Sequence, residues 1–164
     1  MKKIAAFLLI FFVFNSCSDD VTFNEVAFQA LKNNVLWKSS DFKAYLNTDG
    51  SLTLIATSQQ ESLIIDLDDS VKGNYYFSPI SVSTATFITF VDGQESAFIS
   101  DQINDYGEND DMISGDGTLN IVRNDGNTVS GTFSLTLVNE DDQSDERKVD
   151  FTKGNFNNIP IIKQ

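Results

Sequence analysis

Cys17 is the only thiol in this chain, and histidine is absent. Nucleophilic catalysis by Ser-His-Asp or Cys-His groups needs an imidazole, so both classes of enzyme are excluded. Zinc and iron–sulfur sites draw on several His or Cys ligands, so these metal centres are excluded as well. Two kinds of chemistry remain: modification of Cys17 itself, and chemistry done by the 24 Asp and Glu side chains.

The residues in front of Cys17 have the three parts of a secretion signal. Two lysines supply a positive start, an apolar run of 11 residues covers Ile4–Phe14, and the small Ser16 precedes the cysteine. A membrane-spanning helix needs about 20 apolar residues, so this run is too short to stay in the membrane. We therefore expect residues 1–16 to be a signal peptide that is removed.

The four residues Phe14-Asn15-Ser16-Cys17 resemble the lipobox of bacterial lipoproteins. The resemblance implies that cleavage leaves Cys17 as the new N-terminus, carrying fatty-acyl chains such as palmitate. An exported chain with one cysteine cannot form an internal disulfide, and acylation removes the free thiol. Two or more acyl chains hold a protein stably on a membrane. Ordinary signal cleavage with Cys17 unmodified, and an uncleaved anchor, are the alternatives.

The residues directly after Cys17 resemble a signal that sorts lipoproteins to a particular membrane. Ser18 resembles the residue that directs lipoproteins to the outer rather than the inner membrane, and Ser18-Asp19-Asp20 resembles the short acidic signal that sends Bacteroidota lipoproteins to the cell surface. We expect a lipid-anchored protein of the outer membrane, exposed at the cell surface, with residues 17–22 as a tether. In the alternative interpretation, Asp19 and Asp20 are only part of a solvated tether.

The net charge limits the partners. Removing residues 1–16 takes away two lysines and no acid, so the formal charge moves from −13 to −15. Such a surface repels nucleic acid and anionic lipid headgroups, so neither is expected as a partner. We expect the protein to attach to the membrane through its lipid. The expected binding partner is an envelope protein or a small ligand.

An acidic segment at residues 101–116 is the one candidate for metal binding. It holds six acids and no Lys or Arg. Calcium takes six to eight oxygen ligands, which a flexible acidic loop can supply, and Asp105, Asp110 and Asp111 are the candidate ligands. The spacing does not match the helix–loop–helix calcium pattern, and a solvated loop is the alternative. Beyond the covalent lipid and this ion, no cofactor is expected.

Paired carboxylates also carry out glycoside hydrolysis, at a separation of roughly 5–10 Å. With 24 acids in the chain, some pair meets that separation by chance, so the composition does not point to a catalytic pair. The sequence predicts that the protein is not an enzyme. A carboxylate-based glycoside hydrolase is kept as an alternative.

Apolar residues recur with a period of two, which predicts strands. Hairpins are expected where alternating runs meet at a turn containing glycine, because glycine tolerates positive φ. Three such turns are Asp49-Gly50, Asp92-Gly93 and Asn124–Asn127. The clearest strand is Val129–Leu137, with one apolar and one polar face. The predicted strands are 28–31, 35–37, 41–47, 51–57, 62–66, 74–77, 84–91, 94–100, 118–123, 128–138 and 148–156.

Residues 23–32 also have apolar spacing that suits a short helix, but the turn Asn33-Asn34 between apolar runs favours two strands. Gly154 is expected to mark a bulge, and Pro160 to stop sheet pairing. The short connections predict a meander. Residues 23–164 are therefore expected to form one all-β domain of about 8–10 strands, either an antiparallel sandwich or a closed barrel.

Aromatic residues could line a ligand pocket or fill the core. Trp37 could stack on a sugar, and the run Tyr75-Tyr76-Phe77 could line a pocket. Strand alternation places Tyr75 and Phe77 on one face and Tyr76 on the other, so only part of the cluster is expected to be exposed.

Four groups of residues together resemble a family of Bacteroidota lipoproteins built around a β-rich domain of unknown function. They are Phe28-Gln29-Ala30, Trp37, Gly131-Thr132-Phe133-Ser134 and Gly154-x-Phe156-x-x-Ile159-Pro160. The resemblance implies no activity for any residue of this chain. Three hypotheses follow: an anchored domain that binds a ligand or envelope protein, a structural or accessory lipoprotein without a ligand, and the hydrolase.

Overall fold

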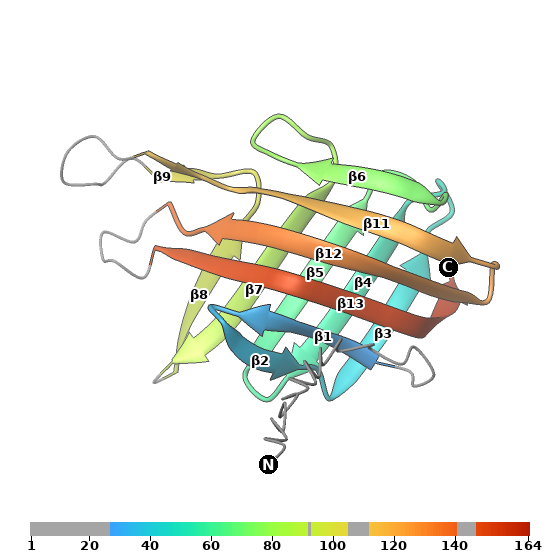
Figure 1. Ribbon diagram of the computed structural model, residues 1–164, viewed down its shortest axis with the longest axis horizontal. Coiled ribbons are helices and arrows are strands. Elements are labelled where there is room, and N and C mark those ends of the chain that lie inside the picture. The colour runs from blue at the N-terminus through green and yellow to red at the C-terminus, as the bar shows by residue number, and fades with distance from the viewer. Residues whose placement is uncertain (1–26, 92, 105–111, 141–146) are drawn as a thin grey trace, which may run out of the picture.

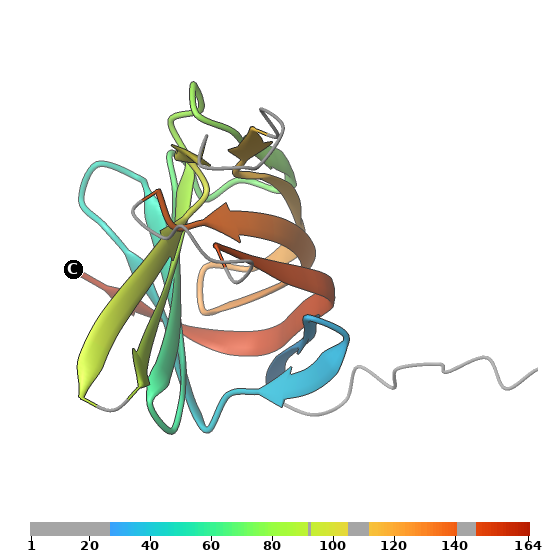
Figure 2. The same cartoon turned by 90° about the vertical axis from the view of Figure 1, so that its left-hand side faces the viewer.

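The structure is a computed structural model that describes residues 27–91, 93–104, 112–140 and 147–164, and every regular element in these residues is a strand. Eleven strands form one continuous sheet that is folded into two layers (Figure 1). The front sheet has the order β2-β1-β13-β12-β11-β6, and the back sheet the order β3-β4-β5-β7-β8. Figure 2 shows the two layers edge-on.

The front strands are β1 (Ala27–Lys32), β2 (Val35–Lys38), β6 (Gly73–Phe77), β11 (Asp116–Asn124), β12 (Thr128–Val138) and β13 (Lys148–Lys163). The back strands are β3 (Asp41–Leu46), β4 (Leu52–Ser58), β5 (Glu61–Leu67), β7 (Thr84–Val91) and β8 (Gln94–Ile99). A separate pair of two-residue strands, β9 (Ile103–Asn104) and β10 (Ile113–Ser114), lies beside them.

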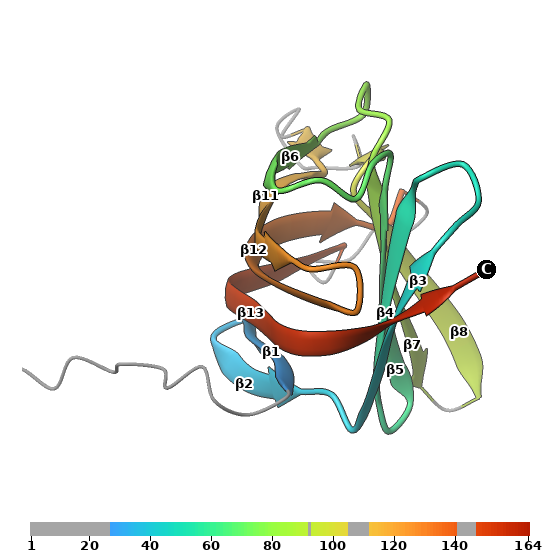
Figure 3. The same cartoon turned by 90° about the vertical axis from the view of Figure 1, so that its right-hand side faces the viewer.

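Two contacts join the layers and give the fold a partly ring-like form. The end of β13 leaves β12 and runs parallel to β3, with Ile161–Lys163 opposite Ala44–Leu46 (Figure 3). On the other side, β12 reaches β8 through a single pair, Val138 with Ile99. The fold therefore combines both expected architectures, a sandwich whose layers meet at two corners.

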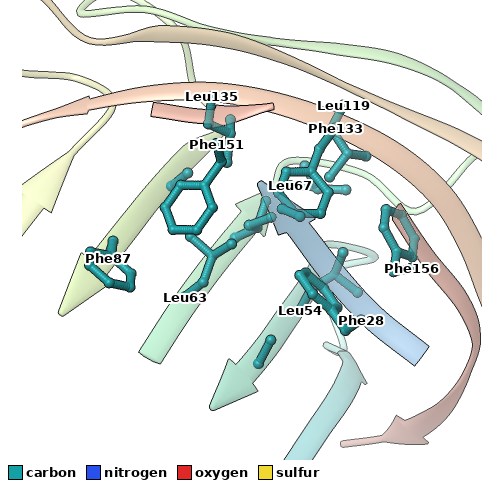
Figure 4. Packing of buried hydrophobic residues seen from close by; sticks show 14 of the residues in the cluster. Phe28, Leu54, Leu63, Leu67, Phe87, Leu119, Phe133, Leu135, Phe151 and Phe156 are labelled. Atoms are coloured by element: carbon teal, nitrogen blue, oxygen red, sulfur yellow. The ribbon is translucent and has the colours of Figure 1, made fainter. Parts of the chain in front are cut away.

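The core lies between the two layers (Figure 4). Alternation along the strands points one face of each sheet inward, as the sequence predicts. Phe28, Phe133 and Phe156 form an aromatic group on the front sheet, with the Phe28 and Phe156 ring centroids 5.8 Å apart and nearly parallel. Phe151 bridges to Trp37 and to Phe87 of the back sheet, with centroids 5.7 and 5.2 Å apart. No side-chain polar atom buried in the described residues lacks a hydrogen-bond partner.

The predicted hairpins are confirmed. Asn33 and Asn34 both have positive φ, 47° and 66°, and they join β1 to β2, so strands and not a helix form at the beginning of the domain. Gly50, Gly93 and Gly126 adopt φ values of 93°, 80° and 81° at the three predicted turns. The pair Asn33-Asn34 has the two left-handed residues that a type I′ hairpin turn requires, whereas Gly50 and Gly126 are single left-handed residues of longer hairpin loops.

Three details of the predicted fold are wrong. The described residues contain 13 strands rather than about 8–10. Each of the eleven predicted segments corresponds to a strand, and the two further strands, β9 and β10, have two residues each and are too short to show an apolar period. The meander is interrupted, because β6 crosses to the front sheet and pairs with β11 while β5 pairs with β7. Pro160 does not end pairing: it lies at the corner where β13 passes from β12 to β3, and there a missing N–H is tolerated.

The bulge expected near Gly154 is present one residue earlier. Two residues of β13, Thr152 and Lys153, oppose the single residue Ser134 of β12 between the pairs Phe133–Gly154 and Leu135–Phe151. Lys153 adopts φ 51°, a conformation that residues other than glycine seldom adopt. A bulge of this kind bends the strand locally and changes where side chains point.

The turn between β11 and β12 depends on one carboxylate. Asp125 accepts hydrogen bonds from the backbone N–H groups of Thr128 (2.8 Å) and Asn127 (3.0 Å) and from the Arg123 guanidinium (2.7 Å). The Thr128 N–H, followed by Arg123, holds the pKa of Asp125 well below its ordinary value of 3.8. The turn is therefore stabilised by the ionised form of this side chain.

We expect Asp125→Ala to lower the free energy of unfolding near neutral pH. Because the folded-state pKa is depressed, the stabilisation is present above the unfolded-state pKa of about 3.9 and is lost as pH falls toward the folded-state value. The difference between wild type and variant should be constant from about pH 7 to about pH 5 and shrink below about pH 4. Urea unfolding across this range measures it, with the exposed Glu95→Ala as control. A difference that does not change with pH would refute the role of the carboxylate.

Candidate functional site

The candidate residues for lipidation, sorting and calcium binding all lie outside the described residues. This holds for the lipidation site Cys17, for the sorting residues Ser18, Asp19 and Asp20, and for the calcium candidates Asp105, Asp110 and Asp111. The signal peptide and the tether, residues 1–22, lie outside them as well. Lipidation, sorting and calcium binding therefore stay predictions.

The residues next to the calcium segment have structural contacts. Asn104 is completely buried, and its Nδ2 donates to the backbone oxygen of Asn139 at 2.7 Å. This bond ties the end of β9 to the end of β12. Within the described residues, no group of three or more Asp, Glu, His or Cys side chains is placed to hold a metal ion.

The front sheet carries an uncharged polar surface on its outer side. The strand register sets five polar side chains in one row across five strands: Gln29 of β1, Asn155 of β13, Thr132 of β12, Asn120 of β11 and Asn74 of β6. Phe28, Phe133, Leu119 and Tyr75, their neighbours along the strands, are buried in the core, so the row points outward. Lys38 of β2 continues the row beyond Gln29.

We name this surface the amide face and define it by the five row residues and Thr118. None of these six side chains hydrogen-bonds to another group in the described part of the chain, although Asn155 is only 9% exposed. Its amide atoms still reach solvent, because no buried side-chain polar atom of the described residues is left without a partner. The amide face therefore presents hydrogen-bonding groups that the fold itself does not use.

A hollow of about 400 Å³ lies in the amide face. Asn74, Asn120, Thr132 and Asn155 line it, and Lys153 brings its only charged side chain. The bulge at Lys153 lies in the wall of this hollow, so a backbone irregularity and the unpaired amides occur at one place. Bulges are over-represented beside functional sites, where they redirect side chains.

A second hollow, of about 580 Å³, lies between the end of β5 and the edge strand β6, and Asn74 lines both hollows. Of the aromatic run in β6, Tyr75 and Phe77 are buried and Tyr76 is 65% exposed, as strand alternation predicts. The Tyr75 hydroxyl donates to the Val71 backbone oxygen at 2.7 Å. Burial, with Asp69 and Asp68 nearby, raises the pKa of Tyr75. This tyrosine is therefore held neutral as a packing residue.

Trp37 belongs to the core and does not form a sugar-stacking platform. It is 5% exposed, and its indole N–H donates to Glu61 Oε2 at 2.7 Å. The other oxygen of Glu61 pairs with the Lys32 ammonium, which also lies 5.2 Å from the centroid of the Phe87 ring. The hollow of about 480 Å³ at this point contains a partly buried ion pair whose charges already satisfy each other. These contacts of Glu61 with Trp37 and Lys32 account for the buried position of Trp37.

No motif in the sequence predicts the amide face. Its members are the ordinary polar residues of half-buried strands, spread from β1 to β13, and only the pairing of five strands brings them together. The available signal was the run of Ser and Thr on the polar side of β12. Without the register of the neighbouring strands, that run indicates only contact with water.

Comparison with known proteins gives one match. A family described as a domain of unknown function, DUF6252, matches residues 24–160. No curated protein and no solved structure matches the chain. Among the described residues, no helix is long and apolar enough to cross a membrane.

Proposed function

Because the chain belongs to the DUF6252 family, whose function is unknown, we propose a function from its own signal region and surface. The protein is a non-catalytic lipoprotein that Cys17 anchors to the outer membrane at the cell surface, and it binds its ligand or partner on the amide face. We propose further that the family consists of such lipoproteins of Bacteroidota. The row of polar side chains without protein partners carries the proposal of a binding protein.

The sequence before the domain supports the anchor. A positive start, a short apolar run and a small residue precede the single cysteine, and a serine and two acids follow it. The first described strand begins at Ala27, so nine residues lie between it and Cys17, which makes ten Cα–Cα steps. A tether of this length, extended, spans at most about 35 Å, enough to hold the domain clear of a lipid surface.

The chemistry of the amide face supports binding without catalysis. The polar groups that line the hollow are amides, hydroxyls and one ammonium group, beside Phe133 and Gly154, so it holds no carboxylate pair for glycoside hydrolysis. The chain has no histidine to act as a general base there. Amides and hydroxyls orient a bound molecule through hydrogen bonds and leave its covalent bonds unchanged.

A filled core favours the second candidate, a structural or accessory lipoprotein without a small ligand. The large aromatic and aliphatic side chains between the layers are fully buried and in mutual contact, as in Figure 4. A lipoprotein that carried a ligand inside its fold would instead need an internal cavity. Any ligand of this protein is therefore bound on the surface.

The anchor is tested by Cys17→Ser in the native host. We expect the wild type to fractionate with the outer membrane, and the variant to lose lipid labelling and leave the membrane fraction. The matched variant Asp19→Asn/Asp20→Asn keeps Cys17, so it should keep the lipid but lose accessibility to protease added to intact cells. A Cys17→Ser protein that still fractionates with membranes would show that the anchor is wrong. A double variant that stays accessible would show that Asp19 and Asp20 are only a tether.

A further inference from the structure

We propose that the ligand of the amide face is an uncharged polysaccharide, an inference that rests on the proposed binding function. The chemical character of the face, its charge and its dimensions each narrow the class of ligand, and all three agree.

The hydrogen-bonding groups of the face match hydroxyl groups. A side-chain amide offers a donor and an acceptor side by side, and a threonine hydroxyl can act as either. A sugar hydroxyl likewise donates and accepts, so each can pair with any member of the face. Phosphate and carboxylate ligands only accept, and they would leave the amide oxygens of Asn74, Asn120 and Asn155 without donors.

The charge of the amide face also suits an uncharged ligand. The hollow contains no carboxylate, although the chain has 24 acids and a formal charge of −13. Lys153 lines the hollow and Lys38 ends the row, whereas Asp68, Asp69 and Lys72 line the second hollow together with Asn74. A strongly anionic polymer meets the repulsion of the whole molecule, whereas a neutral one does not.

The dimensions of the face suit a polymer rather than a single sugar. Neighbouring strands lie about 4.8 Å apart, so the row from Gln29 to Asn74 extends over roughly 19 Å and offers a polar side chain at each strand. Tyr76, 65% exposed, lies on the same side of β6 as Asn74, two residues along the strand. An exposed aromatic ring beside polar groups adds an apolar surface on which the C–H face of a sugar can rest.

Other classes of ligand fit less well. A wholly apolar ligand would leave the amides and hydroxyls of the lining without hydrogen-bond partners, even though carbon atoms make up most of the exposed lining. A metal ion needs carboxylates, and none lines the hollow. A peptide added as an extra strand would run along the backbone of an edge strand, whereas the row consists of side chains and runs across five strands.

Affinity electrophoresis of the purified, detergent-solubilised protein tests the inference. The gels contain soluble neutral polysaccharides (dextran, laminarin, xylan, galactomannan) or the polysaccharide fraction of the host envelope. We expect retardation of the wild type by at least one of them. Asn120→Ala/Asn155→Ala should weaken binding on the order of tenfold, because several hydrogen bonds are lost, with little change in melting temperature. The control Thr86→Ala, on the outer side of the back sheet, should bind like wild type.

Binding to host envelopes separates this inference from the proposed function. If the wild type binds envelopes and the Asn120→Ala/Asn155→Ala variant does not, the amide face is the binding surface. If that binding survives enzymatic removal of polysaccharide but not protease treatment, the ligand is a protein, and the polysaccharide is refuted while the proposed function stands. If the variant binds envelopes and polysaccharides as well as wild type does, the amide face itself is refuted. Retardation by acidic polysaccharides alone would refute a neutral ligand.

Discussion

Phe156→Ala is expected to lower the free energy of unfolding by about 3–5 kcal/mol, a large part of the total of 5–15 kcal/mol typical of a domain. The Phe156 side chain is completely buried in β13, and it stacks on Phe28 of the neighbouring strand β1. Removing the ring leaves a cavity under the centre of the front sheet. The strands around it are held by hydrogen bonds, so they cannot close the space fully.

Urea unfolding followed by tryptophan fluorescence measures this loss, since Trp37 is buried in the same core and is the only tryptophan. The matched control is Phe90→Ala in β7, because Phe90 is 43% exposed. We expect the control to lose no more than about 1 kcal/mol, as surface substitutions usually do. Equal losses for the two variants would contradict the burial of Phe156.

Gly131→Ala is expected to destabilise the protein by about 1–3 kcal/mol, at the upper end for the addition of a single methyl group. Gly131 lies inward in the middle of β12, opposite Phe156 of β13. A Cβ at this position would collide with the backbone oxygen of Asn120 and with the edge of the Phe156 ring. The ring can shift, but the carbonyl belongs to the neighbouring strand β11 and is held by the sheet.

A double-mutant cycle with Phe156→Leu separates the two collisions. In the Phe156→Leu background the contact with the ring is relieved and the contact with the carbonyl remains, so Gly131→Ala should still destabilise, but by less. Thr132→Ala, one residue along and facing outward, is the matched control and should change stability by less than about 0.5 kcal/mol. If Gly131→Ala has no effect in either background, the close packing of β12 against β11 and β13 is wrong.

The same pairing occurs in reverse two residues further along. Gly154 of β13 lies opposite Phe133 of β12, and a Cβ on Gly154 would meet the Phe133 ring at 2.6 Å. Each glycine therefore leaves room for the phenylalanine of the neighbouring strand. The residues that suggested a family resemblance, Gly131, Phe133, Gly154 and Phe156, have structural roles in the central strands of the front sheet.

The sequence alone was sufficient for the local structure. The period of two predicted strands, and turns such as Asn33-Asn34 and Asp49-Gly50 placed the hairpins correctly, because the conformation of a turn depends on the few residues within it. Alternation also predicted correctly that Tyr75 and Phe77 lie on one face of their strand and Tyr76 on the other. The predicted absence of histidine and thiol chemistry in the domain depends on composition only.

The tertiary structure decided which strands pair. The alternating pattern of a strand does not name its partner, so the crossing of β6 to the front sheet and the passage of β13 from β12 to β3 were not predictable. The amide face depends on these pairings, since Gln29, Asn155, Thr132, Asn120 and Asn74 become neighbours only in this register. The sequence by itself determined an acidic, all-β chain with a single cysteine, and it predicts export and lipidation of Cys17. Only the packing of two sheets around a common core placed unpaired amides side by side, because strand order is selected by burial over the whole domain.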